Sequence, residues 1–126
     1  MIERKQYLNR MIALKDKKII KILTGVRRCG KSTMLSLYKR YLLSHGVEER
    51  CIHFINFEDL QFEPLQEYHR LHDAIVNMLV PDKMNYIMLD EVQMVPDFQK
   101  AVDSLFLRDN VDLYLTGSNA YLLSGE

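Results

Sequence analysis

The sequence predicts an α/β fold in which a parallel β-sheet is flanked by helices. Short apolar runs rich in β-branched residues alternate along the 126 residues with segments whose apolar residues recur at helical spacing. This alternation is typical of βαβ crossovers, which place helices on the faces of a parallel sheet. In such sheets ligands bind beyond the carboxyl ends of the strands, so the residues that follow each strand are the candidate site residues.

Four strands and four helices account for the pattern. The strands are expected at residues 18–24, 51–56, 84–89 and 111–115. Apolar stripes predict helices near residues 2–14, 34–42, 68–79 and 98–106. The pair His45-Gly46 and Pro81 are suitable stops for the second and third helices, and Pro96 stands where the fourth can begin.

Composition excludes several classes of protein. Hydrophobic residues make up 48% and charged residues 27%, which argues against wholesale disorder. No apolar run approaches the roughly 18–20 residues that cross a bilayer, and the amino terminus has no signal-peptide core. Two cysteines and four histidines favour neither a disulfide scaffold nor a structural zinc site. We therefore expect one cytoplasmic domain without membrane contact.

Charge is balanced overall but divided along the chain. Residues 1–50 contain 13 Lys and Arg against 4 Asp and Glu, whereas the remaining 76 residues contain 4 against 13. Either the two halves neutralise each other within one fold, which we favour, or the first half binds something anionic. The basic residues of the first helix keep nucleic acid open as a partner, although no base-stacking arrangement accompanies them: Arg4, Lys5, Arg10, Lys15 and Lys17.

A phosphate-binding loop is expected after the first strand. Residues 25–33, Gly-Val-Arg-Arg-Cys-Gly-Lys-Ser-Thr, fit the pattern G-x-x-x-x-G-K-[ST] between a strand and a helix. Its glycines let consecutive backbone N–H groups turn toward an anion, and the helix N-terminus adds its dipole. Lys31 is expected to reach the β- and γ-phosphates, Ser32 to ligate Mg²⁺ and Thr33 to support the loop. The predicted nucleotide-binding set is Gly25, Arg28, Cys29, Gly30, Lys31, Ser32 and Thr33.

Two carboxylates, Asp90 and Glu91, end the third strand. A carboxylate at the end of a buried strand is costly unless a partner or a cation lies beside it, and a magnesium–nucleotide complex supplies that cation. Asp90 is expected to hold the metal, and Glu91 to polarise the water that attacks the γ-phosphate. A guanine-nucleotide site would show x-x-Gly after the carboxylate and an Asn-Lys-x-Asp motif. Here Asp90 is followed by Glu-Val-Gln and no Asn-Lys-x-Asp occurs, so ATP is favoured over a guanine nucleotide.

Polar clusters also follow the fourth and second strands. Thr116 and Ser118 are placed either to contact the γ-phosphate or to form an ordinary turn. Asn56, Glu58 and Asp59 either cap a helix, which we favour, or add acids that face the nucleotide.

These motifs resemble the AAA_14 family of prokaryotic AAA+ ATPases, in which an N-terminal ATPase domain is commonly followed by a domain of unknown function. The resemblance extends over nearly the whole chain, through Tyr7-Leu-Asn-Arg10, residues 24–33, Ile55-Asn-Phe-Glu-Asp59, residues 89–98 and Leu115-Thr-Gly-Ser-Asn119. It implies a P-loop NTPase core and places Thr116 or Ser118 at the sensor of the γ-phosphate. It also implies a fifth strand, a helical lid and an arginine finger from a neighbouring subunit, which the sequence does not reach before Glu126.

The combined expectation is a P-loop ATPase core over residues 1–126, incomplete at its C-terminus as the N-terminal fragment of a longer protein, that binds ATP and Mg²⁺. The predicted catalytic residues are Lys31, Glu91, Thr116 and Ser118, and the predicted metal ligands are Ser32 and Asp90. Without the arginine finger, which self-association would supply, we expect the fragment to hydrolyse ATP poorly. The alternatives are an ATP-bound switch with little turnover and a P-loop kinase, which the adjacent carboxylates disfavour.

Overall fold

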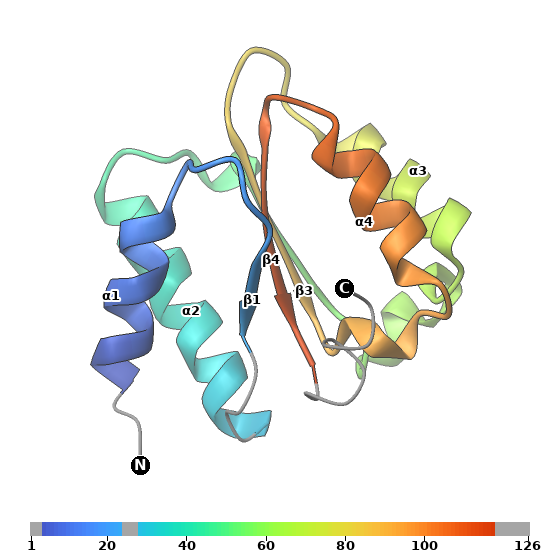
Figure 1. Ribbon diagram of the computed structural model, residues 1–126, viewed down its shortest axis with the longest axis horizontal. Coiled ribbons are helices and arrows are strands. Elements are labelled where there is room, and N and C mark those ends of the chain that lie inside the picture. Colours follow the sequence, from blue (N-terminus) through green and yellow to red (C-terminus); the bar gives the residue numbers. More distant parts are fainter. Residues whose placement is uncertain (1–3, 24–27, 118–126) are drawn as a thin grey trace.

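Four parallel strands form one sheet, and helices cover both of its faces (Figure 1). The computed structural model describes residues 4–23 and 28–117, with the side chains of residue 4 and residues 28–32 outside the description. The strands are β1 (Lys21–Leu23), β2 (Ile52–Asn56), β3 (Asn85–Asp90) and β4 (Val111–Thr116). The helices are α1 (Arg4–Leu14), α2 (Arg28–Ser44), α3 (Tyr68–Met78) and α4 (Phe98–Phe106), with 3-10 turns η1 (Glu49–Cys51), η2 (Leu60–Leu65) and η3 (Val92–Met94). The predicted α/β fold class is confirmed, and each predicted strand and helix is present.

The strand order is β1-β4-β3-β2, so the strand that comes last along the described chain lies between β1 and β3. The register pairs Leu23 with Thr116, Leu89 with Leu115, and β2 with β3 up to their last residues. The carboxyl ends of all four strands therefore lie at one edge of the sheet. Every residue of β3 and β4 is buried, as expected for central strands covered on both faces.

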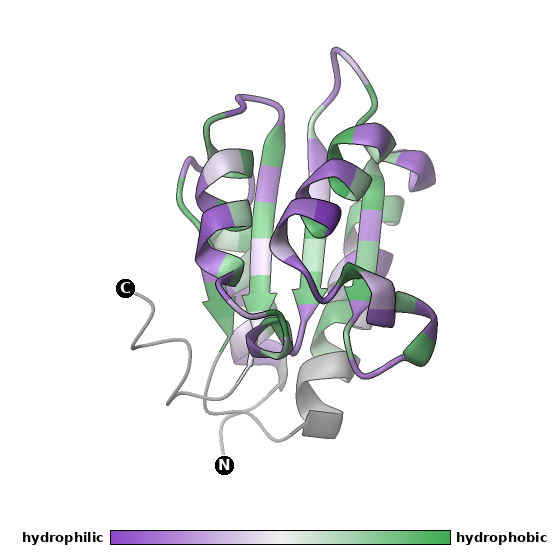
Figure 2. Ribbon diagram, turned by 90° about the vertical axis from the view of Figure 1, so that its right-hand side faces the viewer, coloured by the Kyte–Doolittle hydropathy of each residue, from purple (hydrophilic) through white to green (hydrophobic). Residues whose placement is uncertain are grey.

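Side chains alternate between the two faces along each strand, and this alternation divides the core in two. Tyr86 and Met88 of β3 pack with residues of α1 and α2, whereas Ile87 and Leu89 pack with residues of α3 and α4. On β4, Tyr114 belongs to the α1 and α2 side. Figure 2 shows apolar residues along the strands and hydrophilic residues on the outward sides of the helices. None of the helices in the described part of the chain is long and apolar enough to span a bilayer.

Three local differences from the predicted elements have physical reasons. β1 begins later than residue 18, because the backbone still turns there: the N–H of Lys17 donates to the carbonyl of Leu14 at 3.1 Å, and that of Ile19 to the carbonyl of Lys17 at 2.8 Å. α2 begins earlier than its apolar stripe indicated, because its first turn consists of polar loop residues without an apolar period. The unpredicted turn η2 is capped by Asp59, whose carboxylate accepts from the backbone N–H of Gln61 at 3.0 Å, so the cap interpretation of Asp59 is confirmed.

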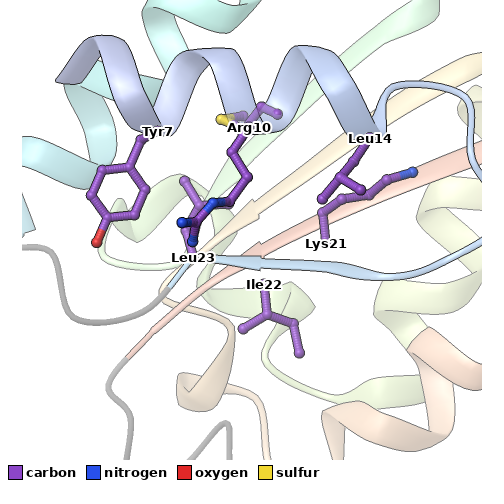
Figure 3. Close-up of a pocket in the computed structure, with 7 residues that line it drawn as sticks. Tyr7, Arg10, Leu14, Lys21, Ile22 and Leu23 are labelled. Atoms are coloured by element: carbon purple, nitrogen blue, oxygen red, sulfur yellow. The ribbon is translucent and has the colours of Figure 1, made fainter. Parts of the chain in front are cut away.

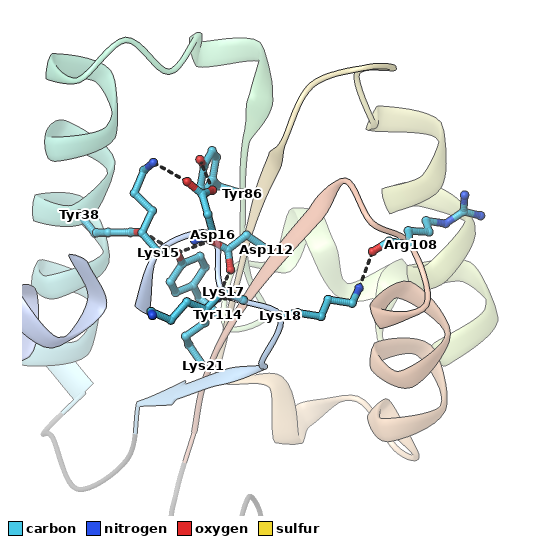
Figure 4. A network of polar contacts seen from close by, with 10 residues as sticks. All are labelled: Lys15, Asp16, Lys17, Lys18, Lys21, Tyr38, Tyr86, Arg108, Asp112 and Tyr114. Atoms are coloured by element: carbon cyan, nitrogen blue, oxygen red, sulfur yellow. Dashed lines mark hydrogen bonds and ion pairs between the residues drawn. The ribbon is translucent and has the colours of Figure 1, made fainter. Parts of the chain in front are cut away.

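A buried polar network joins the amino ends of β1 and β4 to α2 (Figure 4). Lys21 and Asp112 form an ion pair whose side chains are 2% and 1% exposed. Asp112 also accepts hydrogen bonds from the Tyr114 hydroxyl at 2.7 Å and from the backbone N–H of Asp16 at 2.8 Å. The Tyr114 hydroxyl contacts that of Tyr38 on α2. Burial, followed by the charge of Asp112, raises the pKa of Tyr114, so its hydroxyl keeps its proton. The buried carboxylate thus has a counter-charge and further donors, which is the condition for burying a charge.

Lys21→Met keeps the length of this side chain but leaves Asp112 buried without a counter-charge. We expect the free energy of unfolding to fall by about 3–5 kcal/mol. Lys39→Met is the matched control, because Lys39 pairs with Glu49 at 3.4 Å in an exposed position, where a pair contributes about 0–1 kcal/mol. Urea denaturation followed by circular dichroism measures both variants. Equal midpoints would contradict a stabilising role for the buried pair.

Candidate functional site

Three polar side chains lie beside one another at the carboxyl edge of the sheet. Asn56, Asp90 and Thr116 are the last residues of β2, β3 and β4. Asn56 and Asp90 are register partners, and the pairing of Leu89 with Leu115 places Asp90 next to Thr116. By the alternation along each strand, Thr116 lies on the same face as Tyr114, the face that α2 covers. Strand order and register alone therefore assemble this group.

Thr116 connects the two predicted carboxylate residues. Its hydroxyl donates to a carboxylate oxygen of Asp90 and accepts a hydrogen bond from the backbone N–H of Glu91 at 3.0 Å. Thr116, Asp90 and Glu91 are only 0%, 1% and 6% exposed. Because buried carboxylates need compensation by donors or a cation, this cluster is suited to binding a positively charged group.

Glu91 has a left-handed backbone, with φ 60° and ψ 47°, where the chain turns from β3 into η3. This conformation costs a residue with a Cβ about 1–2 kcal/mol. The Gln93 amide donates to Oε1 of Glu91 at 2.8 Å and so orients the carboxylate. The amide oxygen of Gln93 is itself buried and has no hydrogen-bond partner within the part of the chain that the structure describes. No role was expected for Gln93, although it lies within residues 89–98, where the sequence resembles the AAA_14 family.

The N-terminus of α2 follows closely after β1. Leu23, the last residue of β1, pairs with Thr116, and α2 starts at Arg28. The first backbone N–H groups of a helix have no partners within it and carry the positive end of its dipole, which suits a phosphate group. Thr33 is half-buried within α2.

The described structure brings together part of the predicted site. Asp90, Glu91 and Thr116 are joined directly. Gly25 and Ser118 lie outside the described residues. For the rest of the loop the backbone lies in the first turns of α2 while the side chains lie outside the description: Arg28, Cys29, Gly30, Lys31 and Ser32.

The carboxylate and hydroxyl oxygens at this edge of the sheet suit a Mg²⁺ ion whose remaining ligands come from a phosphate group. Carboxylate and hydroxyl oxygens are hard ligands of the kind that Mg²⁺ prefers. Among the described residues no group of three or more His, Cys, Asp and Glu side chains gathers as a metal cage. One or two carboxylates without a cage are the usual protein contribution where substrate phosphates complete the coordination of Mg²⁺.

Comparison with known families and proteins finds two sequence matches. The model of an AAA domain family, AAA_14, matches residues 17–126. An uncharacterized protein of Haemophilus influenzae is 38% identical over 127 residues, which cover 100% of this chain and 32% of that protein. The chain therefore spans about a third of the length of this relative.

Two solved structures share the fold. A structure of Drosophila ORC bound to DNA has a TM-score of 0.62, covering 92% of this chain and 76% of that one. A structure of Drosophila ORC bound to AT-rich DNA and Cdc6 has a TM-score of 0.63, covering 92% of this chain and 46% of that one. Sequence identity is 14% in both, so this likeness concerns the fold alone.

Thr116→Val replaces the buried hydroxyl by a methyl group of the same shape. Asp90 then loses a donor and the Glu91 N–H loses its acceptor, so the free energy of unfolding should fall by about 1–3 kcal/mol for each group left unsatisfied. Thr116→Ser keeps the hydroxyl and should cost less. Differential scanning calorimetry measures both variants, and a Tm for Thr116→Val equal to or above that of Thr116→Ser would argue against the bridging role.

Proposed function

The chain belongs to the AAA_14 family of AAA domains, and on that premise we propose that this nucleotide-binding module binds Mg²⁺–ATP at the carboxyl edge of its sheet and hydrolyses it. The observation that carries the proposal is the contact of the Thr116 hydroxyl with the buried Asp90 carboxylate. The position of α2 supports the proposal. This helix starts five residues after Leu23, which pairs with Thr116, and the N-terminus of a helix suits a phosphate group.

The residues divide the work by their chemistry. Lys31 and the backbone N–H groups of residues 25–33 bind the phosphates, and Ser32 and Asp90 hold the metal ion. When bound, Mg²⁺ withdraws charge from the phosphate oxygens. Thr116 holds the Asp90 carboxylate in place, and Thr116 or Ser118 would act as the sensor of the γ-phosphate.

Glu91 is the base in this proposal. Its carboxylate orients the attacking water and accepts the proton that the water loses. The hydrogen bond from Gln93 at 2.8 Å holds one carboxylate oxygen, so a single orientation is available. A carboxylate fixed beside the metal ligand favours water over a kinase substrate as the phosphoryl acceptor.

We also propose that a further strand beside β1 completes the module. Within the described residues, β1 pairs with β4 alone. A pocket lies between α1 and β1, lined by Tyr7, Arg10, Met11, Leu14 and residues 21–23 (Figure 3). Ile22, whose side chain lies on the side of β1 away from α1 (Figure 3), is 41% exposed, an unusual state for a strand residue of a covered parallel sheet. The threefold greater length of the Haemophilus relative supports a continuation of the chain, and a neighbouring copy would supply the arginine that the transition state needs.

Lys31→Ala removes the ammonium group that the proposal places on the phosphates. A charge-assisted hydrogen bond is worth about 1.5–3 kcal/mol, so the Kd for a fluorescent ATP analogue with Mg²⁺ should rise about 10–100-fold in the full-length protein. Lys39→Ala, on the exposed side of the same helix, is the control and should leave the Kd unchanged. Equal affinities for the wild type and Lys31→Ala would contradict a phosphate site at this loop.

Glu91→Gln keeps the size of the side chain and removes the base. The full-length variant should bind ATP with an affinity close to that of the wild type, while phosphate release at saturating ATP slows by about 10²–10⁴-fold. The exposed substitution Asp103→Asn is the control. A wild-type rate as slow as that of Glu91→Gln would instead favour the ATP-bound switch, and phosphate transferred to an acceptor would favour a kinase.

A further inference from the structure

The two oppositely charged halves of the chain lie on opposite faces of the sheet. α1 and α2 cover one face of the sheet, and η2, α3 and α4 cover the other (Figure 1). Among described residues 5–50 the exposed acids are Asp16, Glu48 and Glu49, and Glu49 pairs with Lys39 of α2. The opposite side exposes a series of acids: Glu58, Asp59, Glu63, Glu67, Asp73, Asp97 and Asp103. That side also exposes the cations Arg70, Lys100 and Arg108, so the two sides of the sheet differ in their balance of charge.

Four exposed cations, Lys5, Arg10, Lys17 and Arg40, make up what is called here the basic face. None of them forms an ion pair within the described part of the chain. Their positive potential is thus not cancelled by local partners, and such a potential attracts anions over about a Debye length.

The acids among described residues 5–50 do not offset the basic face, because each is paired with a cation outside it. Glu48 pairs with Arg50 and Lys83, and Glu49 pairs with Lys39.

One carboxylate oxygen of Asp16 accepts from the Lys15 ammonium at 2.7 Å and the other from the Tyr86 hydroxyl at 2.6 Å. Burial opposes the ionisation of Asp16, but these hydrogen bonds and the nearby lysine charges outweigh it and leave its pKa below the ordinary value. Asp16 is therefore ionised near neutral pH and already neutralised by Lys15.

We propose that the basic face binds the phosphate backbone of nucleic acid. Its other exposed side chains include Gln6, Asn9 and Ser36, and phosphates are contacted by Lys, Arg, Asn, Gln and Ser. The cores of protein–protein interfaces are instead apolar and aromatic and are depleted of Lys. Leu43 is the one large exposed hydrophobic residue on α1 and α2 within their described side chains. The composition of the face therefore favours a polyphosphate over a second protein.

Binding at this face is independent of base sequence. α1 has 11 residues and extends about 16 Å, a length over which one strand of a duplex carries about five phosphates. A helix lying along the backbone contacts phosphates and reads no base edges. If the four cations each neutralise one phosphate, the slope of log K against log[salt] is about −3.6, so the affinity falls about 100-fold between 50 and 200 mM salt.

The test measures fluorescence anisotropy of a labelled 20-base-pair duplex of random sequence with the full-length protein, without nucleotide. One triple variant carries Lys5→Gln, Lys17→Gln and Arg40→Gln. The matched control carries Arg70→Gln, Lys100→Gln and Arg108→Gln, exposed cations outside the basic face, and has the same net charge. All six substituted side chains are exposed, and thermal denaturation checks that both triple variants fold. If the basic-face triple does not fold, the single variant Arg40→Gln replaces it in the binding measurement.

The basic-face triple should weaken binding at 50 mM salt by at least about tenfold and bring the salt slope close to −1, while the control stays within about twofold of the wild type. Equal losses in the two triples would overturn the proposal, because net charge rather than placement would then explain binding. The absence of duplex binding by the wild type at 50 mM salt would also overturn it. A third contrary outcome is that the basic-face triple, but not the control, abolishes self-association and leaves duplex binding unchanged. Since ATP is absent, none of these outcomes depends on the proposed hydrolysis.

Discussion

A one-residue slip between β3 and β4 would move every buried side chain of one strand relative to its neighbours and turn its core residues to the other face. The register that pairs Leu89 with Leu115 prevents this and places Asp90 next to Thr116, on the face that α2 covers. The pairing of β1 with β4 then sets Leu23, the last residue of β1, beside Thr116. The site is thus a consequence of how four strands pair.

The polar network at the opposite end of the strands reinforces that register. Apolar side chains tolerate small displacements, whereas the ion pair of Lys21 with Asp112 and the linked hydroxyls of Tyr114 and Tyr38 need particular partners. The network connects three elements around the candidate site. β1 precedes the predicted phosphate-binding loop, β4 carries Thr116, and α2 begins with the last residues of that loop. A shifted register would separate this pair and leave a buried charge without its partner, which is strongly destabilising.

Features that depend on local pattern were predictable from the sequence. Apolar periodicity gave the strands and helices, and the glycine-rich loop and the carboxylates after β3 gave the candidate chemistry. Strand order was not predictable, because it depends on contacts between distant residues; Lys21 and Asp112 are 91 positions apart. For the same reason the bond between Thr116 and Asp90 became evident only from the fold. The left-handed turn at Glu91 and its contact with Gln93 were also missed, since neither residue type signals that conformation.

The central place of β4 has a consequence for synthesis of the protein on the ribosome. Until residues 111–116 emerge, β1 and β3 have no shared neighbour and both expose strand edges and apolar surface. Exposed edges are templates for association with other chains. A nascent chain of this domain is therefore exposed to association with other chains until β4 has been synthesised. Only then can β1 and β3 be joined in one sheet.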